Sequence, residues 1–249
     1  MHDAVVHPSG ARIRWVELPG AEPARVYVHG LGATSAPYYA EVAAHPLLPQ
    51  HRSLLIDLLG FGISDRPRDF AYTLETHADA LAEALRQAGV AGASVIAHSM
   101  GGAVAIVLAS RHPELIANLV LVDADPPAPV EPGGGGIASY TEEAFVSHGW
   151  KEVRERVGPH RWSTMRLADL RGLHRTAVSL AAGTTPAMRR LLQDLPIPRA
   201  LLHPEGDPPE DTDSLRASGV RVVGIPESGH SVMLDNPEAF VRALAGFLH

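Results

Sequence analysis

A serine stands where a run of β-prone residues passes without a linker into a helix-like run, in the stretch VIAHSMGG at residues 95–102. Such a tight turn from strand to helix exposes the hydroxyl group and places it beside the positive end of a helix dipole. The usual G-x-S-x-G pattern is broken by Ala97, whereas Gly101 keeps it. Because alanine adds only one methyl group, we expect the turn to form and Ser99 to be a nucleophile.

A nucleophilic serine needs a base, and it needs two peptide N–H groups that stabilise an oxyanion. His230, in the stretch PESGHSVMLDNP, follows the last predicted strand and is the candidate base. The stretch HGLG at residues 29–32 follows an earlier strand, so the N–H groups of Leu31 and Met100 are predicted to form the oxyanion hole. We expect His98 to be structural and to point away from the pocket.

These groups must be positioned by a sheet whose strands end at one edge. Short apolar runs, typical of strands buried on both faces, alternate with helical stretches. A hairpin comes first, at residues 4–7 and 11–18, and the later strands are predicted at residues 24–30, 53–60, 93–99, 118–124, 199–203 and 220–225. Helices are predicted at residues 76–89, 101–113 and 236–249. This alternation indicates a doubly wound α/β sheet, which binds ligands at the carboxyl ends of its strands.

The alternation stops between Pro126 and Pro198, where helical pieces follow the Pro/Gly-rich stretch PPAPVEPGGGG. We therefore divide the chain into a core of residues 1–125 and 199–249 and a helical insertion of residues 126–198. Residues that could contact a substrate are mostly apolar: Trp150, Trp162, Met165 and Leu191 in the insertion, and Tyr38 and Tyr39 after the HGLG turn. They favour a small or medium hydrophobic acyl group, or else they simply pack the insertion onto the sheet.

Four stretches in this order, HGLG, DLLGFGISDRP at residues 57–67, AHSMGG and SGH, resemble the α/β-hydrolase superfamily. The resemblance covers nearly the whole chain outside the insertion, which is similar to that family's cap. It implies a mostly parallel eight-stranded sheet flanked by helices, with a Ser-His-Asp triad. In the family the stretch DLLGFGISDRP is a structural loop, so Asp57 and Asp65 are expected to shape a turn.

The acid of such a triad has two candidates. Most of the family carries it after the penultimate strand, where this chain has Asp207. Some relatives, such as haloalkane dehalogenases, carry it after the strand that follows the nucleophile helix, where this chain has Asp123. The usual glycine that closes the penultimate strand is replaced by Pro204, which disfavours Asp207, and an aspartate at the other position is often unused. Family frequency places Asp207 first and leaves Asp123 as the alternative.

Composition excludes several classes of protein. The 249 residues contain a single lysine, Lys151, and carry a net charge of −7, so a nucleic-acid partner is not expected. The chain has no cysteine, which excludes disulfides and thiolate metal sites, and its histidines show no metal-ligand spacing. We predict no metal and no cofactor. The sequence shows no signal peptide and no membrane-spanning run, so we expect a soluble cytoplasmic protein without a membrane partner.

Acyl chemistry on Ser99 is the predicted function. The substrate would be a small molecule, an ester, thioester or lactone, or a compound cleaved at a carbon–carbon bond, and a carboxylesterase is the most similar class. Haloalkane dehalogenases and epoxide hydrolases of this fold use an aspartate as the nucleophile, so the resemblance implies neither. A non-hydrolytic ligand-binding or receptor protein and a lyase on the same fold are the alternatives. Composition leaves the oligomeric state open.

Overall fold

The computed structural model describes residues 1–124 and 136–248. Its centre is an eight-stranded sheet with strand order β1-β2-β4-β3-β5-β6-β7-β8. The strands are β1 (His2–Val5), β2 (Arg12–Leu18), β3 (Ala21–Val28), β4 (His51–Asp57), β5 (Ala93–His98), β6 (Ile116–Val122), β7 (Arg199–Pro204) and β8 (Val220–Ile225). Each strand predicted from the sequence is present, and the doubly wound α/β fold is confirmed.

The N-terminal hairpin is the antiparallel part of the sheet. Strand β1 pairs with β2, and β2 pairs with β4, in antiparallel register, whereas the remaining neighbours are all parallel. Parallel strands that share a direction end at one edge of the sheet, and here β5, β6, β7 and β8 bring residues 98–99, 122–123, 203–204 and 225–226 to that edge. The candidate catalytic groups therefore start from adjacent strand ends.

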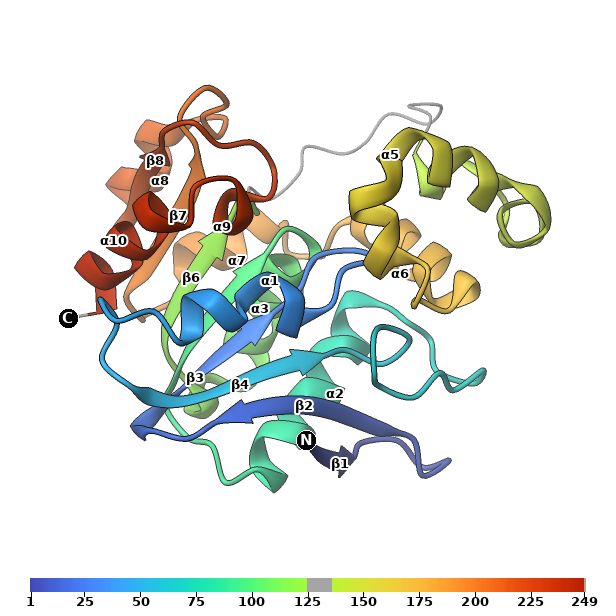
Figure 1. The fold of residues 1–249 in the computed structure, drawn as a ribbon, viewed down its shortest axis with the longest axis horizontal. Coiled ribbons are helices and arrows are strands. Elements are labelled where there is room, and N and C mark those ends of the chain that lie inside the picture. The colour runs from blue at the N-terminus through green and yellow to red at the C-terminus, as the bar shows by residue number, and fades with distance from the viewer. Residues whose placement is uncertain (125–135, 249) are drawn as a thin grey trace.

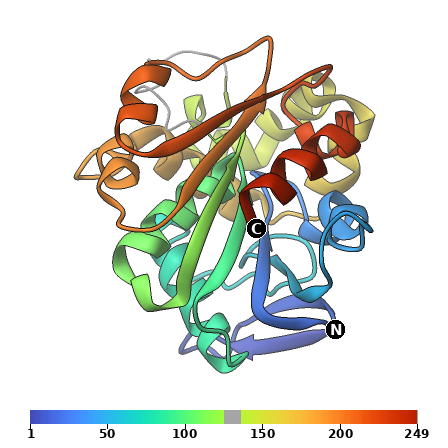
Figure 2. The ribbon, with the colours of Figure 1, turned by 90° about the vertical axis from the view of Figure 1, so that its left-hand side faces the viewer.

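Helices cover both faces of the sheet (Figures 1 and 2). One apolar cluster joins the sheet to α2 (Leu74–Gln87), α3 (Met100–Arg111) and α7 (Met188–Asp194), and the other joins it to α1 (Ser35–Ala43), α9 (Val232–Asp235) and α10 (Pro237–Leu248). Helix α8 (Thr212–Ala217) precedes β8. The sequence analysis missed α1, since its stretch SAPYYAEVA combines a proline with weak helical periodicity.

The described part of the segment between β6 and β7 consists of helices joined by turns, without a strand. It contains η2 (Ile137–Ser139), α4 (Glu142–Ala144), η3 (Phe145–Gly149), α5 (Trp150–Met165), α6 (Leu170–Ala182) and α7. Figure 1 shows α5 and α6 at the upper right, on the side toward which β4 runs. The predicted entry to the insertion, PPAPVEPGGGG, lies outside the described residues except for Gly136. No helix in the described ranges combines the length and apolar character that crossing a bilayer requires.

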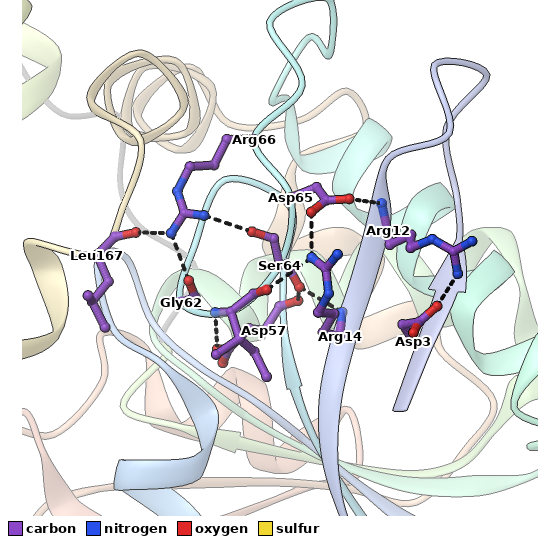
Figure 3. A network of polar contacts seen from close by, with 10 residues as sticks. Asp3, Arg12, Arg14, Asp57, Gly62, Ser64, Asp65, Arg66 and Leu167 are labelled. Atoms are coloured by element: carbon purple, nitrogen blue, oxygen red, sulfur yellow. Dashed lines mark hydrogen bonds and ion pairs between the residues drawn. The ribbon is translucent and has the colours of Figure 1, made fainter. Parts of the chain in front are cut away.

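The loop that follows β4 is held by carboxylates (Figure 3). Asp57 accepts hydrogen bonds from the backbone N–H groups of Ser35 at 2.7 Å and Ile63 at 3.0 Å. Asp65 accepts from the N–H of Arg12 at 2.9 Å. These contacts agree with the turn-shaping role expected for both aspartates, and they fix the loop to β2 and α1.

The same loop also reaches the insertion. The Arg66 guanidinium donates to the carbonyl of Gly62 at 2.7 Å and to that of Leu167 at 2.6 Å, just after α5 (Figure 3). A second contact joins α2 to α6, where His77 Nε2 lies 3.0 Å from the Thr176 hydroxyl oxygen. Polar contacts among the described residues therefore join the insertion to the core.

Two fully buried histidines predict that the protein loses stability in mild acid. Burial lowers the pKa of His77 and of His98 to about 3, so both stay neutral in the folded protein. An unfolded histidine binds a proton below a pKa of about 6.5. The unfolded chain therefore binds more protons between these values, and each histidine lowers the free energy of unfolding by up to about 1.4 kcal/mol per pH unit as pH falls.

Urea denaturation at pH 7 and pH 5 measures this effect. The free energy of unfolding of the wild type should fall between the two pH values. In His77→Gln, whose amide can bond Thr176 without titrating, the fall should be smaller. An equal fall in both proteins would show that His77 does not titrate in this way.

Candidate active site

Ser99 stands alone at a strained turn between β5 and α3. Its φ is 51° and its ψ is −122°. Non-glycine residues rarely have a positive φ, and this combination also lies outside the left-handed helical region. The Ser99 N–H donates to the Val122 carbonyl at 3.0 Å, so the turn is tied to the end of β6. Such strain is found mainly where a side chain must be presented for function.

The small residues around Ser99 are required by close backbone contacts. A Cβ atom on Gly101 would lie 2.4 Å from the His29 carbonyl oxygen, and one on Gly30 would lie 3.2 Å from the Ser99 Cβ atom. Ala97 is fully buried in β5, and its methyl group is accommodated there. The departure from G-x-S-x-G therefore leaves the turn intact, as expected from the sequence.

His230 is hydrogen-bonded to Asp123. The distance between His230 Nδ1 and Asp123 Oδ2 is 2.6 Å. A carboxylate only accepts, so the proton of the neutral imidazole lies on Nδ1 and Nε2 keeps a free lone pair. The His230 side chain is 41% exposed and that of Asp123 20% exposed, so the pair lies at the surface of the site.

Asp207, the first choice of acid from the sequence, does not make this bond. After Pro204 the chain turns back, with the Asp207 N–H donating to the Pro204 carbonyl at 3.0 Å, and Asp207 is exposed in the loop. Asp123 is presented by a backbone φ of 42°, and its N–H donates to the Leu202 carbonyl at 2.7 Å. The two loop conformations favour the alternative acid, Asp123, over Asp207.

A cavity that is open to solvent lies over Ser99. Its wall contains Ser99 and His230, the turn Gly30, Leu31, Gly32 and Ala33, and the side chains of Tyr38, His98, Arg161, Met165 and Ser231. Ser99 and His230 both belong to the described residues, and no hydrogen bond joins them in the structure. Catalytic hydrogen bonds of this kind are often long in the free enzyme and shorten when substrate binds. The hydroxyl, the imidazole and the HGLG turn nevertheless meet in one cavity.

Of the six residues that the sequence offered as substrate contacts, Tyr38 and Met165 belong to this wall, whereas Tyr39 and Leu191 do not. Met165 packs on the HGLG turn so closely that a Cβ atom on Gly32 would lie 2.7 Å from its side chain. The two tryptophans do not line the cavity, because Trp150 and Trp162 stack on each other with ring centroids 5.9 Å apart. Their stacking bridges a break in α5, where Gly158 has a non-helical φ of 73°.

The two predicted oxyanion donors occupy suitable positions. Leu31 lines the cavity, and Met100 is the first residue of α3, directly after Ser99. The first N–H groups of a helix have no partner within the helix, so that of Met100 is free to bind an anion. Both amides belong to backbone that is fixed by the close contacts of Gly30 and Gly101.

The expectation that His98 points away from the pocket is wrong. His98 lines the cavity, and its Nε2 lies 2.7 Å from the His230 carbonyl oxygen. Because a carbonyl only accepts, His98 donates from Nε2, and its buried Nδ1 has no partner within the described chain. The centroids of the His98 and His230 rings are 4.6 Å apart. With the hydrogen bond, this contact makes His98 a support of the loop that carries His230.

Arg161 is the cavity residue that sequence reasoning missed. It lies one helical turn before Met165 on α5, a spacing that places both side chains on one face. The stretch HRWSTM gave no signal, since many arginines lie on exposed helix faces. The described residues hold no group of three or more histidines and carboxylates arranged to bind a metal ion.

A family model described as alpha/beta hydrolase fold matches residues 26–206. The chain belongs to the α/β-hydrolase fold family. A solved structure of a thermophilic esterase from Thermogutta terrifontis superposes with a TM-score of 0.81 at 22% identity, covering 100% of this chain and 98% of that one. At this identity the match shows the fold, and it agrees with the confirmed eight-stranded sheet.

Two relatives of this α/β-hydrolase are similar in sequence. An esterase of Mycobacterium tuberculosis is 29% identical, with 95% of this chain and 85% of the relative aligned. A probable lysophospholipase of Arabidopsis thaliana, BODYGUARD 4, is 37% identical over 119 residues, which are 47% of this chain. This chain spans only 28% of the plant protein's length. Both of these relatives have the names of hydrolases.

Proposed function

We propose that this α/β-hydrolase is a serine hydrolase that cleaves an ester, thioester or lactone through an acyl-enzyme on Ser99. The observation that carries the proposal is the 2.6 Å bond between His230 and Asp123 beside a cavity that also contains the strained Ser99. A hydroxyl group, an oriented imidazole and a carboxylate are the three parts that such chemistry needs.

In this mechanism Ser99 Oγ attacks the substrate carbonyl carbon while His230 Nε2 takes its proton. Asp123 holds the proton on His230 Nδ1 and stabilises the positive imidazole that forms. The N–H groups of Leu31 and Met100 bind the oxygen that becomes negative. His230 then protonates the leaving group, and water, activated by His230, releases the acid from Ser99.

We propose that α5 and α6 act as the cap that limits substrate size. The cavity beneath α5 has apolar walls at Tyr38 and Met165, which suit the methylene groups of a small or medium acyl chain. Helix α7 packs on α3 through the main core, so it belongs with the sheet in spite of its place in the insertion. Residues 137–182 are thus the part that covers the site.

Rapid mixing with 4-nitrophenyl acetate tests the proposal. Formation of an acyl-enzyme releases a burst of nitrophenol, about one equivalent per protein, before slower turnover begins whenever deacylation limits the rate. A series of longer acyl chains should then show a maximum of kcat/KM at short or medium length. Absence of turnover across the whole series would contradict the proposal, and turnover without covalent acylation would favour a lyase or a direct attack by water.

A further inference from the structure

A positive charge lies in the wall of the Ser99 cavity. Arg161, from α5, lines this cavity together with the strand-end residues Ser99 and His98. Burial lowers the pKa of His98 to about 3, and the positive charge of Arg161 contributes to this lowering. Arg161 therefore lines the cavity and also acts electrostatically on a histidine of the same wall.

Arg161 forms no ion pair with a carboxylate among the described residues. The described lining of the cavity contains no aspartate or glutamate. Two other arginines of the insertion are paired, since Arg171 and Arg175 both bind Glu142 at 2.6 Å. An arginine that faces a binding cavity without a carboxylate partner can receive one from a ligand.

We propose that Arg161 binds a carboxylate of the substrate, so that the preferred ester, thioester or lactone carries a second, negatively charged end. This inference rests on the proposed hydrolase function. The planar guanidinium presents paired N–H donors that match the two oxygens of a carboxylate, and the apolar walls at Tyr38 and Met165 take the methylene groups between the two ends. The substrate class is therefore a half-ester or an acidic lactone.

The test compares two acyl esters of equal length and shape. Mono-4-nitrophenyl adipate carries a terminal carboxylate, and the nitrophenyl ester of adipic acid monoamide carries a neutral amide in its place. The wild type should prefer the carboxylate ester by about tenfold in kcat/KM, as for a hydrogen-bonded charge pair at a partly open site. The preference should fall as salt is added. A carboxylate on the leaving group is tested in the same way with 4-acetoxybenzoate and 4-acetoxybenzamide.

Variants at two arginines of α5 separate local binding from general charge. In whichever ester pair the wild type prefers the carboxylate, Arg161→Gln should reduce the ratio of the two kcat/KM values to near unity. Arg161→Lys should restore part of this ratio. Arg154→Gln removes the same charge from the same helix outside the Ser99 cavity and should keep the preference. Equal effects of Arg161→Gln and Arg154→Gln, or an absent preference in both ester pairs of the wild type, would overturn the inference.

A binding measurement distinguishes this inference from the proposed chemistry. Adipate, which is not hydrolysed, should shift amide resonances of the HGLG turn and α5 in titrations of the wild-type protein. The affinity for adipamide, measured in the same way, should be at least about tenfold lower. Adipate binding that depends on Arg161 in a protein without esterase activity would retain the anion site and reject the serine hydrolase. Esterase activity without any Arg161-dependent binding or preference would retain the serine hydrolase and reject the anion site.

Discussion

Replacing Ser99 with alanine is expected to lower kcat for ester hydrolysis by about 10⁶-fold, the loss typical of removing a serine nucleophile. The φ of 51° is already strained for serine, and alanine is similar in size, so the fold should be kept. Steady-state hydrolysis of 4-nitrophenyl esters measures the loss, and the thermal midpoint checks the fold.

Ser231 is the matched control, because it lines the same cavity and follows His230 directly. Ser231→Ala should change kcat by less than about tenfold, since only one hydroxyl group can be the nucleophile. If Ser231→Ala showed the large loss and Ser99→Ala did not, the assignment of the nucleophile would be wrong.

Asp123→Asn should lower kcat by about 10⁴-fold, whereas Asp207→Asn should change it by less than about tenfold. The asparagine amide can donate to His230 Nδ1, which would move the imidazole proton to Nε2 and remove the lone pair that must accept the Ser99 proton. Asp207 lies near enough to be a fair control, since it lines a second cavity together with Asp123.

Measurement of kcat/KM with one ester in the wild type and both variants is sufficient. Thermal unfolding of each variant shows whether the fold is kept. A large loss in Asp207→Asn with little change in Asp123→Asn would assign the acid to the loop after β7 and refute the role given to the 2.6 Å bond.

The sheet and the positions of Ser99 and His230 could be predicted because they depend on local patterns. Apolar runs mark buried parallel strands, and small residues around Ser99 mark a turn where backbone segments touch. The structure gives the reason in the 2.4 Å approach of a Gly101 Cβ to the His29 carbonyl.

The choice of acid could not be predicted in this way. Asp123 and Asp207 follow neighbouring strands, β6 and β7, so both begin at the same edge of the sheet. What separates them is a positive φ at Asp123 and a tight turn after Pro204. Aspartate tolerates positive φ better than most residues, but the sequence does not show which aspartate adopts it.

The wall of the cavity was predicted only in part for a similar reason. Trp150 and Trp162 are large and apolar, which favours burial, but they stack on each other from the two sides of the break at Gly158. Arg161 lies at the cavity although arginine usually lies on the surface. Helix spacing groups Arg161 with Met165, yet only the packing of Met165 on Gly32 shows that this face meets the active site.

Labelling with a fluorophosphonate probe tests the central claim most directly, because the probe reacts with a serine only where a base and an oxyanion site activate it. Proteolysis and mass spectrometry then locate the adduct. A single adduct on the peptide that contains Ser99, lost in Ser99→Ala and strongly slowed in Asp123→Asn, is the predicted result. An unmodified Ser99 in protein that hydrolyses esters, or equal labelling of Ser99→Ala and wild type, would contradict it.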